Sequence, residues 1–364
     1  MKKIVVFSNM YPSSEHPTYG IFVKNQVELL KKSGLVIEVK AIDNPIGGKF
    51  QSLLKYGKWF ASSVFYLIGN RQKISLTHAH YAFPTGLLSL IGKRLFHLPY
   101  VVTVHGGDID KMAKKGARIA GLTRTILQEA THVITVGERL KQEVVTNFGV
   151  SETNVTVMSM GVDRSVFHPL PRAVVRDELG LPVHDPTILF IGNLIREKGV
   201  LELVQSFATI QKKLPEVSLH LIGSTKSEAF VEEVKQYITI HQIEGTHFQG
   251  TKTQKELAKW LAGADVLALP SYHEGFGLVA LEAMAAGTPV VASDVGGLSY
   301  LLVDGAGILV PAREVEGLSQ GLLQALSGDQ VTNVEKREQI VHAHSYEMIL
   351  EKLLKIYGET EYTR

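Results

Sequence analysis

The sequence predicts an α/β protein made of two doubly wound domains, each with a parallel sheet. Short apolar runs without polar alternation, typical of buried parallel strands, alternate with amphipathic helical patterns in the first half of the chain. The second half repeats the same scheme. The 364 residues also suffice for two domains at the usual ~100–200 residues each.

The first half carries five apolar runs that are typical of strands, with three helical patterns between them. The predicted strands are residues 4–7, 37–42, 100–104, 132–136 and 155–158. The predicted helices are residues 22–32, 86–95 and 119–130. The first of these helices is expected to stop at Gly34, because glycine readily adopts the conformation that ends a helix.

The second half begins after a proline-rich linker at residues 167–186. Its predicted strands are residues 187–191, 218–222, 246–248, 266–270 and 290–293. Its predicted helices are residues 200–212, 226–240, 253–263 and 278–287. We therefore divide the chain into an N-terminal domain (1–168), a C-terminal domain (169–345) and a last helix (346–364), which we expect to pack back toward the N-terminal domain.

Composition narrows the class of protein. The chain has no cysteine, which excludes disulfides and thiolate metal sites and suits a reducing compartment. The apolar run near the N-terminus is too short for a signal sequence or a spanning helix, so we expect a cytoplasmic protein.

Charge is unevenly distributed along the chain. Residues 1–168 carry 21 Lys and Arg against 11 Asp and Glu, whereas residues 169–364 carry 17 Lys and Arg against 25 Asp and Glu. A basic first half indicates an anionic partner, and a chance asymmetry of a solvated surface is the alternative.

Residues 49–73 combine aromatic and basic residues at helical spacing, including Trp59, Phe60 and Phe65 beside Lys55 and Lys58. Such a basic amphipathic stretch resembles an element that lies on an anionic membrane surface. The alternative is a helix that buries one face in the core and solvates its basic face. No recognised nucleic-acid-binding motif accompanies the basic charge, so no nucleic-acid partner is expected.

Residues 190–199 join a buried strand to a helix through a glycine and a basic loop. Gly192 and Asn193 follow the strand, and Arg196 and Lys198 lie in the loop. Positive side chains at the carboxyl end of a parallel strand, next to the N-terminus of a helix, suit the binding of an anion.

Residues 270–278 lead from another strand into a mostly apolar helix. The amides of this turn and of the first helical turn can hold phosphate or sugar oxygens; the residues concerned are Gly275, Phe276, Gly277 and Leu278. Glu274 precedes the turn and Glu282 lies one turn inside the helix. Carboxylates accept strong hydrogen bonds from sugar hydroxyls, although Glu282 could alternatively interact with the helix dipole.

His105 and Asp108 follow a predicted strand of the first half together with two glycines, a position typical of ligand-binding residues at a sheet edge. A packed histidine that caps the strand is the alternative for His105, and Asp108 could orient either His105 or an acceptor. His80 and the neighbouring His78 could line an acceptor site. They do not predict a metal centre, since three ligands with defined geometry are not apparent.

Together these segments resemble the family 4 glycosyltransferases. The resemblance runs from Lys3 to at least Pro311 and rests on the pair Glu274 and Glu282 with seven residues between them, on residues 274–278 and 197–199, and on Gly161, Val162 and Asp163 followed by Phe167 and Pro169. It implies the GT-B fold of two facing Rossmann-like domains with a central cleft. It also implies transfer of a sugar from a nucleotide-diphosphosugar with retention of anomeric configuration.

The resemblance assigns roles to the donor-side residues. Glu274 would contact hydroxyls of the donor sugar and Glu282 the ribose. Lys198, with Arg196, would neutralise the leaving diphosphate, and the amides of residues 275–278 would line the sugar and phosphate.

The resemblance also implies roles in the first half of the chain. His105 would hydrogen-bond to the transferring sugar, and the loop that holds Gly20 would approach the diphosphate. Asp108 and His80 would lie on the side of the acceptor, which we expect to be a glycan or a polyprenyl-linked molecule used in surface-polysaccharide synthesis. A peripheral position at the inner face of the cell membrane would follow.

Three positions depart from the family pattern. Asn193 stands where members usually have an arginine, and Tyr300 stands where a glutamate is usual. The loop at residues 17–23 has the single Gly20 instead of the commoner pair of glycines, a variant that resembles the group building surface polysaccharides.

No resident cofactor and no metal are expected, because the resemblance implies that a cationic clamp replaces the divalent ion. A Rossmann oxidoreductase is disfavoured, since no G-x-G-x-x-G follows the first strand. The remaining alternatives are a GT-B epimerase or phosphorylase and a non-catalytic protein that binds nucleotide sugars.

Overall fold

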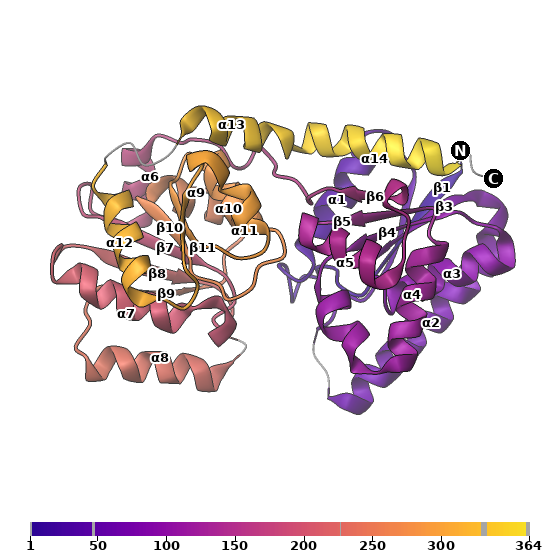
Figure 1. Cartoon of the computed structure of the whole chain (residues 1–364), viewed down its shortest axis with the longest axis horizontal. Coiled ribbons are helices and arrows are strands. Elements are labelled where there is room, and N and C mark those ends of the chain that lie inside the picture. The colour runs from indigo at the N-terminus through magenta and orange to yellow at the C-terminus, as the bar shows by residue number, and fades with distance from the viewer. Residues whose placement is uncertain (1, 46–47, 226, 329–332, 362–364) are drawn as a thin grey trace. The chain divides into compact units, whose positions relative to one another are not determined.

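The computed structural model describes residues 2–45, 48–225, 227–328 and 333–361. The chain forms two compact units, one comprising Met1–Met160 and Tyr346–Arg364 and the other Gly161–Ser345 (Figure 1). The chain thus leaves the first unit at Met160, ahead of the junction at residues 168 and 169 that the sequence predicts. Lys226, the predicted start of a helix, lies outside the described residues.

The first unit is built on a six-stranded sheet with the order β2-β1-β3-β4-β5-β6, in which all paired strands run parallel. Its strands are β1 (Lys3–Ser8), β2 (Ile37–Ala41), β3 (Ile74–His80), β4 (Tyr100–Val104), β5 (His132–Thr135) and β6 (Val155–Val157). All except β3 match predicted strands to within two residues at either end, because helices cover both faces of the sheet and favour uninterrupted apolar runs.

The strand β3 is missing from the predicted elements because it carries polar residues inside the sheet. Thr77, His78 and His80 are fully buried. Thr77 Oγ1 donates to Ser89 Oγ over 2.9 Å, and the two ring nitrogens of His78 lie 2.6 Å from Tyr357 Oη and 2.8 Å from Thr103 Oγ1. Thr77 and His78 are tolerated in this strand because they find hydrogen-bond partners within the unit.

Helices cover both faces of this sheet: α1 (Ile21–Lys32), α2 (Lys49–Asn70), α3 (Thr85–Phe96), α4 (Ala117–Glu129), α5 (Glu138–Phe148) and α14 (Tyr346–Glu361). Figure 1 shows α1 and α14 on one face of the sheet and α2, α3 and α4 on the other. The helix α14 buries Ile349, Leu353, Ile356 and Tyr357 against the core of the first unit. This spacing places them on one face of the helix, and each buried side chain contributes about 1.5–3 kcal/mol of hydrophobic free energy. The last helix therefore belongs to the first unit.

The second unit has a parallel sheet with the order β12-β11-β10-β7-β8-β9. Its strands are β7 (Thr187–Ile191), β8 (Ser218–Ile222), β9 (Thr246–Gly250), β10 (Val266–Leu269), β11 (Val290–Ser293) and β12 (Ile308–Val310). The order reverses between β7 and β10, as in a dinucleotide-binding Rossmann sheet, and ligands of such sheets bind at the carboxyl ends of the two strands that flank the reversal.

The helices of the second unit are α6 (Arg172–Leu179), α7 (Val200–Gln211), α8 (Glu228–Ile240), α9 (Gln254–Gly263), α10 (Leu278–Ala286), α11 (Gly297–Leu301), α12 (Val315–Leu326) and α13 (Val334–Ala343). Thr253 and Glu256 form a capping box at the start of α9. The elements β12 and α11 to α13 lie beyond the last predicted strand and are not among the predicted elements.

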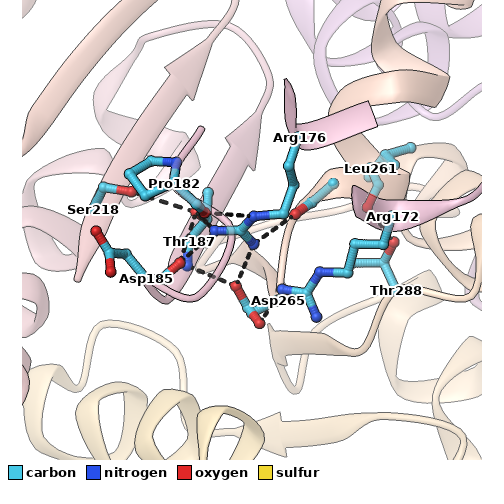
Figure 2. Close-up of polar contacts among 10 residues, drawn as sticks. Arg172, Arg176, Pro182, Asp185, Thr187, Ser218, Leu261, Asp265 and Thr288 are labelled. Atoms are coloured by element: carbon cyan, nitrogen blue, oxygen red, sulfur yellow. Dashed lines mark hydrogen bonds and ion pairs between the residues drawn. The ribbon is translucent and has the colours of Figure 1, made fainter. Parts of the chain in front are cut away.

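Arg176 fastens α6 to the amino-terminal edge of this sheet (Figure 2). Its side chain is 1% exposed, and every guanidinium nitrogen donates a hydrogen bond. The acceptors are Pro182 O at 2.8 Å, Gly263 O at 3.0 Å, Asp265 Oδ2 at 3.1 Å, Thr187 Oγ1 at 3.2 Å and Asp185 O. Asp265 also accepts from the more exposed Arg172 and, over 2.8 Å, from the amide of Thr187. The buried charge of Arg176 is thus both paired and fully hydrogen-bonded.

Candidate active site

Two loops of the second unit lie at the reversal of strand order. The first, at residues 192–199, follows β7, and the second, at residues 270–277, follows β10. These strands are adjacent and parallel, with Ile188 opposite Val266 and Leu189 opposite Leu267. Both loops therefore emerge at the same edge of the sheet, where an open α/β sheet binds its ligand.

Lys198 and Glu274 meet across these two loops. Lys198 Nζ lies 2.6 Å from Glu274 Oε2, and both side chains are largely shielded from solvent. Lys198 closes the 3-10 turn η5 (Arg196–Lys198), and the next residue, Gly199, has a φ of 68°. A Cβ atom at Gly199 would lie 2.0 Å from the carbonyl oxygen of Pro270, so only glycine permits this approach of the loops. The predicted cationic and acidic residues are thereby brought together.

The glycines of residues 275–277 and of the turn before α11 pack against each other. A Cβ atom at Gly296 would lie 2.0 Å from the carbonyl oxygen of Glu274, and one at Gly297 would lie 2.3 Å from the Cα of Phe276. The amide of Gly297 donates to the carbonyl of Glu274 over 3.2 Å. The turn at residues 296 and 297, uninformative in sequence alone, therefore supports the backbone that carries Glu274.

The helix α10 begins directly after this turn and points its first amides toward the same edge of the sheet. Gly277 caps it with a φ of 98° and contributes no side-chain hydrogen bond to the exposed amides. Such a start leaves donors for an anion or a carbohydrate oxygen, and the helix dipole favours negative charge at this position.

Glu282 lies one turn further along α10 and is half-buried. Burial raises the pKa of Glu282 to about 8, and a hydrogen bond from Gln254 on α9 opposes this shift. The carboxyl group is thus largely protonated near neutral pH, so that it can both donate and accept a hydrogen bond.

Arg196 does not join Lys198 and Glu274 in this structure. Its guanidinium is exposed, pairs with Glu233 of α8 and lies 5.1 Å from the ring centre of Phe230. Asn193, at the position where an arginine is usual, accepts a hydrogen bond from Ser224 Oγ over 2.6 Å. Lys198 is therefore the cation that the structure places beside Glu274.

Tyr272 is a polar residue of the second loop that the sequence analysis does not single out. Its amide donates to Glu197 O over 2.9 Å, its hydroxyl donates to Glu202 Oε1, and Arg313 lies 4.3 Å from its ring centre. In the sequence, the position of Tyr272 between Pro270 and Glu274 indicates that it lies near the site. Tyr272 ties the two loops and α7 together.

The predicted site residues of the first unit lie close together at the carboxyl ends of β3 and β4. His80 Nδ1 lies 3.2 Å from His105 Nε2, and the ring of Tyr81 lies 4.6 Å from that of His105. Burial lowers the pKa of His105 to about 3 and holds the pKa of His80 well below its usual range. Both imidazoles are therefore neutral at physiological pH, each with one donor and one acceptor nitrogen.

Asp108 is buried beneath the same loops. Its carboxylate accepts from the amides of Ala82 at 2.8 Å, Gly106 at 3.0 Å and His105 at 3.3 Å. Burial raises the pKa of Asp108 to about 6, and these backbone hydrogen bonds oppose that shift. Of the alternatives weighed for Asp108, the structure places it where it orients the backbone of His105.

Gly20 begins α1 with a φ of 70°, and a Cβ atom there would lie 2.5 Å from the backbone of Met10. Glycine is thus required for the contact between the loop after β1 and the start of α1.

Two family models match the chain. "Glycosyltransferase Family 4" matches residues 18–166, and "Glycosyl transferases group 1" matches residues 172–344. The first match covers most of the first unit and the first six residues of the second, the other lies within the second unit, and together they include the site residues described above.

Individual proteins agree with the family models. The D-inositol 3-phosphate glycosyltransferase of Arthrobacter sp. is 33% identical over 286 residues, which are 75% of this chain and 67% of the relative. A Bacillus subtilis protein named as a teichuronic acid biosynthesis glycosyltransferase, TuaC, is 25% identical over 359 residues and 88% of each chain. Among solved structures, Anabaena Alr3699/HepE in complex with UDP and glucose shares the fold with a TM-score of 0.78 at 19% identity, covering 98% of this chain and 99% of the other. The predicted α/β fold of the GT-B type is confirmed, and the chain belongs to the family 4 glycosyltransferases.

Proposed function

We propose that this glycosyltransferase moves a sugar from a nucleoside-diphosphosugar to a glycan or polyprenyl-linked acceptor, with retention and without a metal ion. The observation that carries the proposal is the 2.6 Å pair of Lys198 and Glu274 at the strand-order reversal, next to the first amides of α10. A cation and helix amides suit a diphosphate, and a carboxylate suits sugar hydroxyls.

The nucleoside diphosphate part of the donor would bind to residues of the second unit. The diphosphate would contact Lys198 and the amides of the turn before α10, and the ribose would contact Glu282. The complex of Alr3699/HepE with UDP and glucose supports this choice of donor class, since that protein shares the fold.

Transfer would break the bond between the anomeric carbon and the β-phosphate oxygen and form a bond to the acceptor oxygen. Negative charge grows on the leaving phosphate in the transition state, so Lys198 would stabilise it more than the ground state. The acceptor would approach the face of the sugar that the phosphate leaves, and its hydroxyl proton would pass to the leaving phosphate. No side-chain base is then required.

The first unit would supply His105 as a hydrogen-bonding partner for the transferring sugar. A neutral imidazole suits this role, because it neither adds charge to the transition state nor loses its acceptor nitrogen. His80 and Asp108 would act as positioning residues, one through the ring of His105 and the other through its backbone.

A role in surface-polysaccharide synthesis fits the relatedness to TuaC, a protein named for teichuronic acid biosynthesis. The acceptor would then be a growing glycan on a lipid carrier, and the enzyme would work at the cytoplasmic face of the membrane.

The experiment is a screen of nucleotide sugars with the full chain, in which release of nucleoside diphosphate is measured with and without lipid-linked acceptors. We expect release to depend on the acceptor, and NMR of the product to show the anomeric configuration of the donor. Turnover of the donor to an epimer without any acceptor would support the epimerase, and binding without turnover would support the non-catalytic protein. Either result, or an inverted product, would overturn the proposal.

A further inference from the structure

The helix α2 exposes a continuous apolar stripe on the first unit. Phe50 is 71% exposed and Phe65 is 73% exposed, and Leu54, Ala61 and Ile68 also lie on the surface. Their spacing of four, seven, four and three residues places them along one side of the helix over nearly its whole length. The opposite side of α2 is buried through Trp59, Ser63 and Leu67.

The alternative of a core helix accounts for only one face of α2. Burial of Trp59 and Leu67 accounts for one face as a core helix, but it leaves the exposed stripe unexplained. Soluble monomers rarely expose aligned large apolar side chains without an interaction partner. Among the described residues, none of the helices is long and apolar enough to cross a bilayer.

The charge around the stripe is of one sign. The sequence from Asn44 to Gly107 contains no Asp or Glu. Lys58 flanks the stripe beside Phe65, and Arg71 follows the end of α2 directly. Arg71 also borders a hollow of about 1150 Å³, whose lining includes Lys2 and Lys93 but no carboxylate. An aromatic stripe with cations at its side and end matches an anionic bilayer surface, in which apolar side chains enter the headgroup region and lysines contact phosphates.

We propose that α2 docks the first unit on an anionic lipid bilayer. The exposed stripe enters the interface, and Lys58, Arg71 and the basic hollow hold lipid phosphates. The partner of the exposed face of α2 is thus a surface that is apolar inside and negatively charged outside.

The same helix approaches the predicted acceptor residues. The strand β2 leads into α2 at the carboxyl edge of the sheet, the same edge at which Tyr81 and His105 follow β3 and β4. The ring of Tyr81 in turn contacts that of His105. Docking through α2 would therefore bring His105 close to the headgroups of lipid-linked acceptors, a consequence that rests on the proposed function.

The test is co-flotation of the full chain with vesicles of phosphatidylcholine alone or with added phosphatidylglycerol. A stripe variant, Phe50→Ser with Phe65→Ser, and a charge variant, Lys58→Gln with Arg71→Gln, are compared with the wild type. The matched controls lie in the second unit: Ile240→Ser for an apolar residue of equal exposure, and Lys212→Gln with Lys213→Gln for two exposed cations. Tryptophan fluorescence, to which the buried Trp59 of the first unit and the buried Trp260 of the second both contribute, reports whether the variants stay folded.

We expect the wild type and both controls to float only with vesicles that contain phosphatidylglycerol, and high salt to release them. The charge variant should lose about fivefold in partition coefficient for each cation removed. The stripe variant should lose about tenfold or more. Binding that ignores lipid charge, or that both α2 variants retain, would overturn the proposal.

Light scattering tests the remaining alternative, in which a second copy of the chain covers the stripe. A dimer of the wild type that Phe65→Ser dissociates would show this alternative to be correct in place of the bilayer. Transfer to a soluble acceptor should be unchanged in both α2 variants. If the α2 variants lose vesicle binding but keep normal transfer, α2 serves as the docking surface. If the wild type itself shows no transfer, the proposed function fails, and the docking proposal is judged by vesicle binding alone.

Discussion

Lys198 Nζ and Glu274 Oε2 lie 2.6 Å apart, so the cation and the carboxylate at the proposed donor site neutralise each other. A diphosphate that binds Lys198 must displace the carboxylate of Glu274. This displacement is favourable only if the carboxylate then accepts hydrogen bonds from other donor groups. Hydroxyls of the sugar supply such donors. We therefore expect the pair to favour the complete donor over free phosphate.

The first prediction separates the two members of this pair. Lys198→Ala should lower transfer by about 10²–10³-fold, the usual cost of removing one donor to a developing charge. Glu274→Gln should also lower transfer, yet it should bind the free nucleoside diphosphate about fivefold more tightly, because Lys198 loses a competing partner worth about 1 kcal/mol. Calorimetric titration with the diphosphate and initial rates of transfer check both.

A matched control exists in the same unit. Lys259 and Glu178 form a more exposed ion pair, also at 2.6 Å. Lys259→Ala should leave transfer unchanged, and equal losses in both lysine variants would remove the special role of Lys198.

The second prediction concerns the pH dependence of Glu282. Its pKa in the folded protein is raised to about 8 from the usual 4.5, so its contribution to stability is full below pH 4.5 and is lost as the pH rises through about 8. Glu282→Gln should therefore gain about 2–4 kcal/mol in unfolding free energy relative to the wild type between pH 5 and pH 8. Urea titrations across this range measure it, with the exposed Glu232→Gln as the control that should show no such change.

The third prediction concerns the buried histidines of the first unit. Burial lowers the pKa of His78 to about 3, so stability is full above about pH 6.5 and declines as the pH falls toward 3. Replacing His78 by Gln should reduce this decline by about 1.4 kcal/mol per pH unit. The exposed His184→Gln is the control, and an identical acid transition in both variants would contradict the assignment.

The fourth prediction compares two arginines that share one carboxylate. Arg176→Met removes buried hydrogen bonds to four residues besides Asp265 and should cost about 3–5 kcal/mol in unfolding free energy. Arg172→Met removes a solvent-exposed partner of Asp265 and should cost no more than about 1 kcal/mol. Similar losses in chemical denaturation would show that the buried network adds nothing beyond the ion pair.

The fifth prediction addresses the cationic clamp. Transfer should continue in excess EDTA, because Lys198 and the amides of α10 provide the positive potential for the leaving phosphate. Rates with EDTA, and after readdition of Mg²⁺ or Mn²⁺, test this, and a strict need for either ion would refute the metal-free mechanism.

The sequence by itself determined the class of the fold and most strands, because parallel strands buried on both faces require unbroken apolar runs that few other elements show. It also determined that Lys198 and Glu274 follow strands. It did not predict β3, whose Thr77, His78 and His80 are polar; Thr77 and His78 are accommodated by partners from other elements of the unit. Pattern recognition detects local periodicity and is blind to such partners.

Tertiary structure alone decided which of these residues meet. Lys198 and Glu274 are 76 residues apart and touch because β7 and β10 are neighbours and because Gly199 lets their loops approach. Arg196, two residues from Lys198, instead pairs with Glu233 on α8. Likewise, helical spacing marked α2 as amphipathic, but only packing showed that Trp59 faces the core while Phe65 faces solvent. Contacts between distant segments depend on how strands are ordered, and that order is a property of the whole packed sheet.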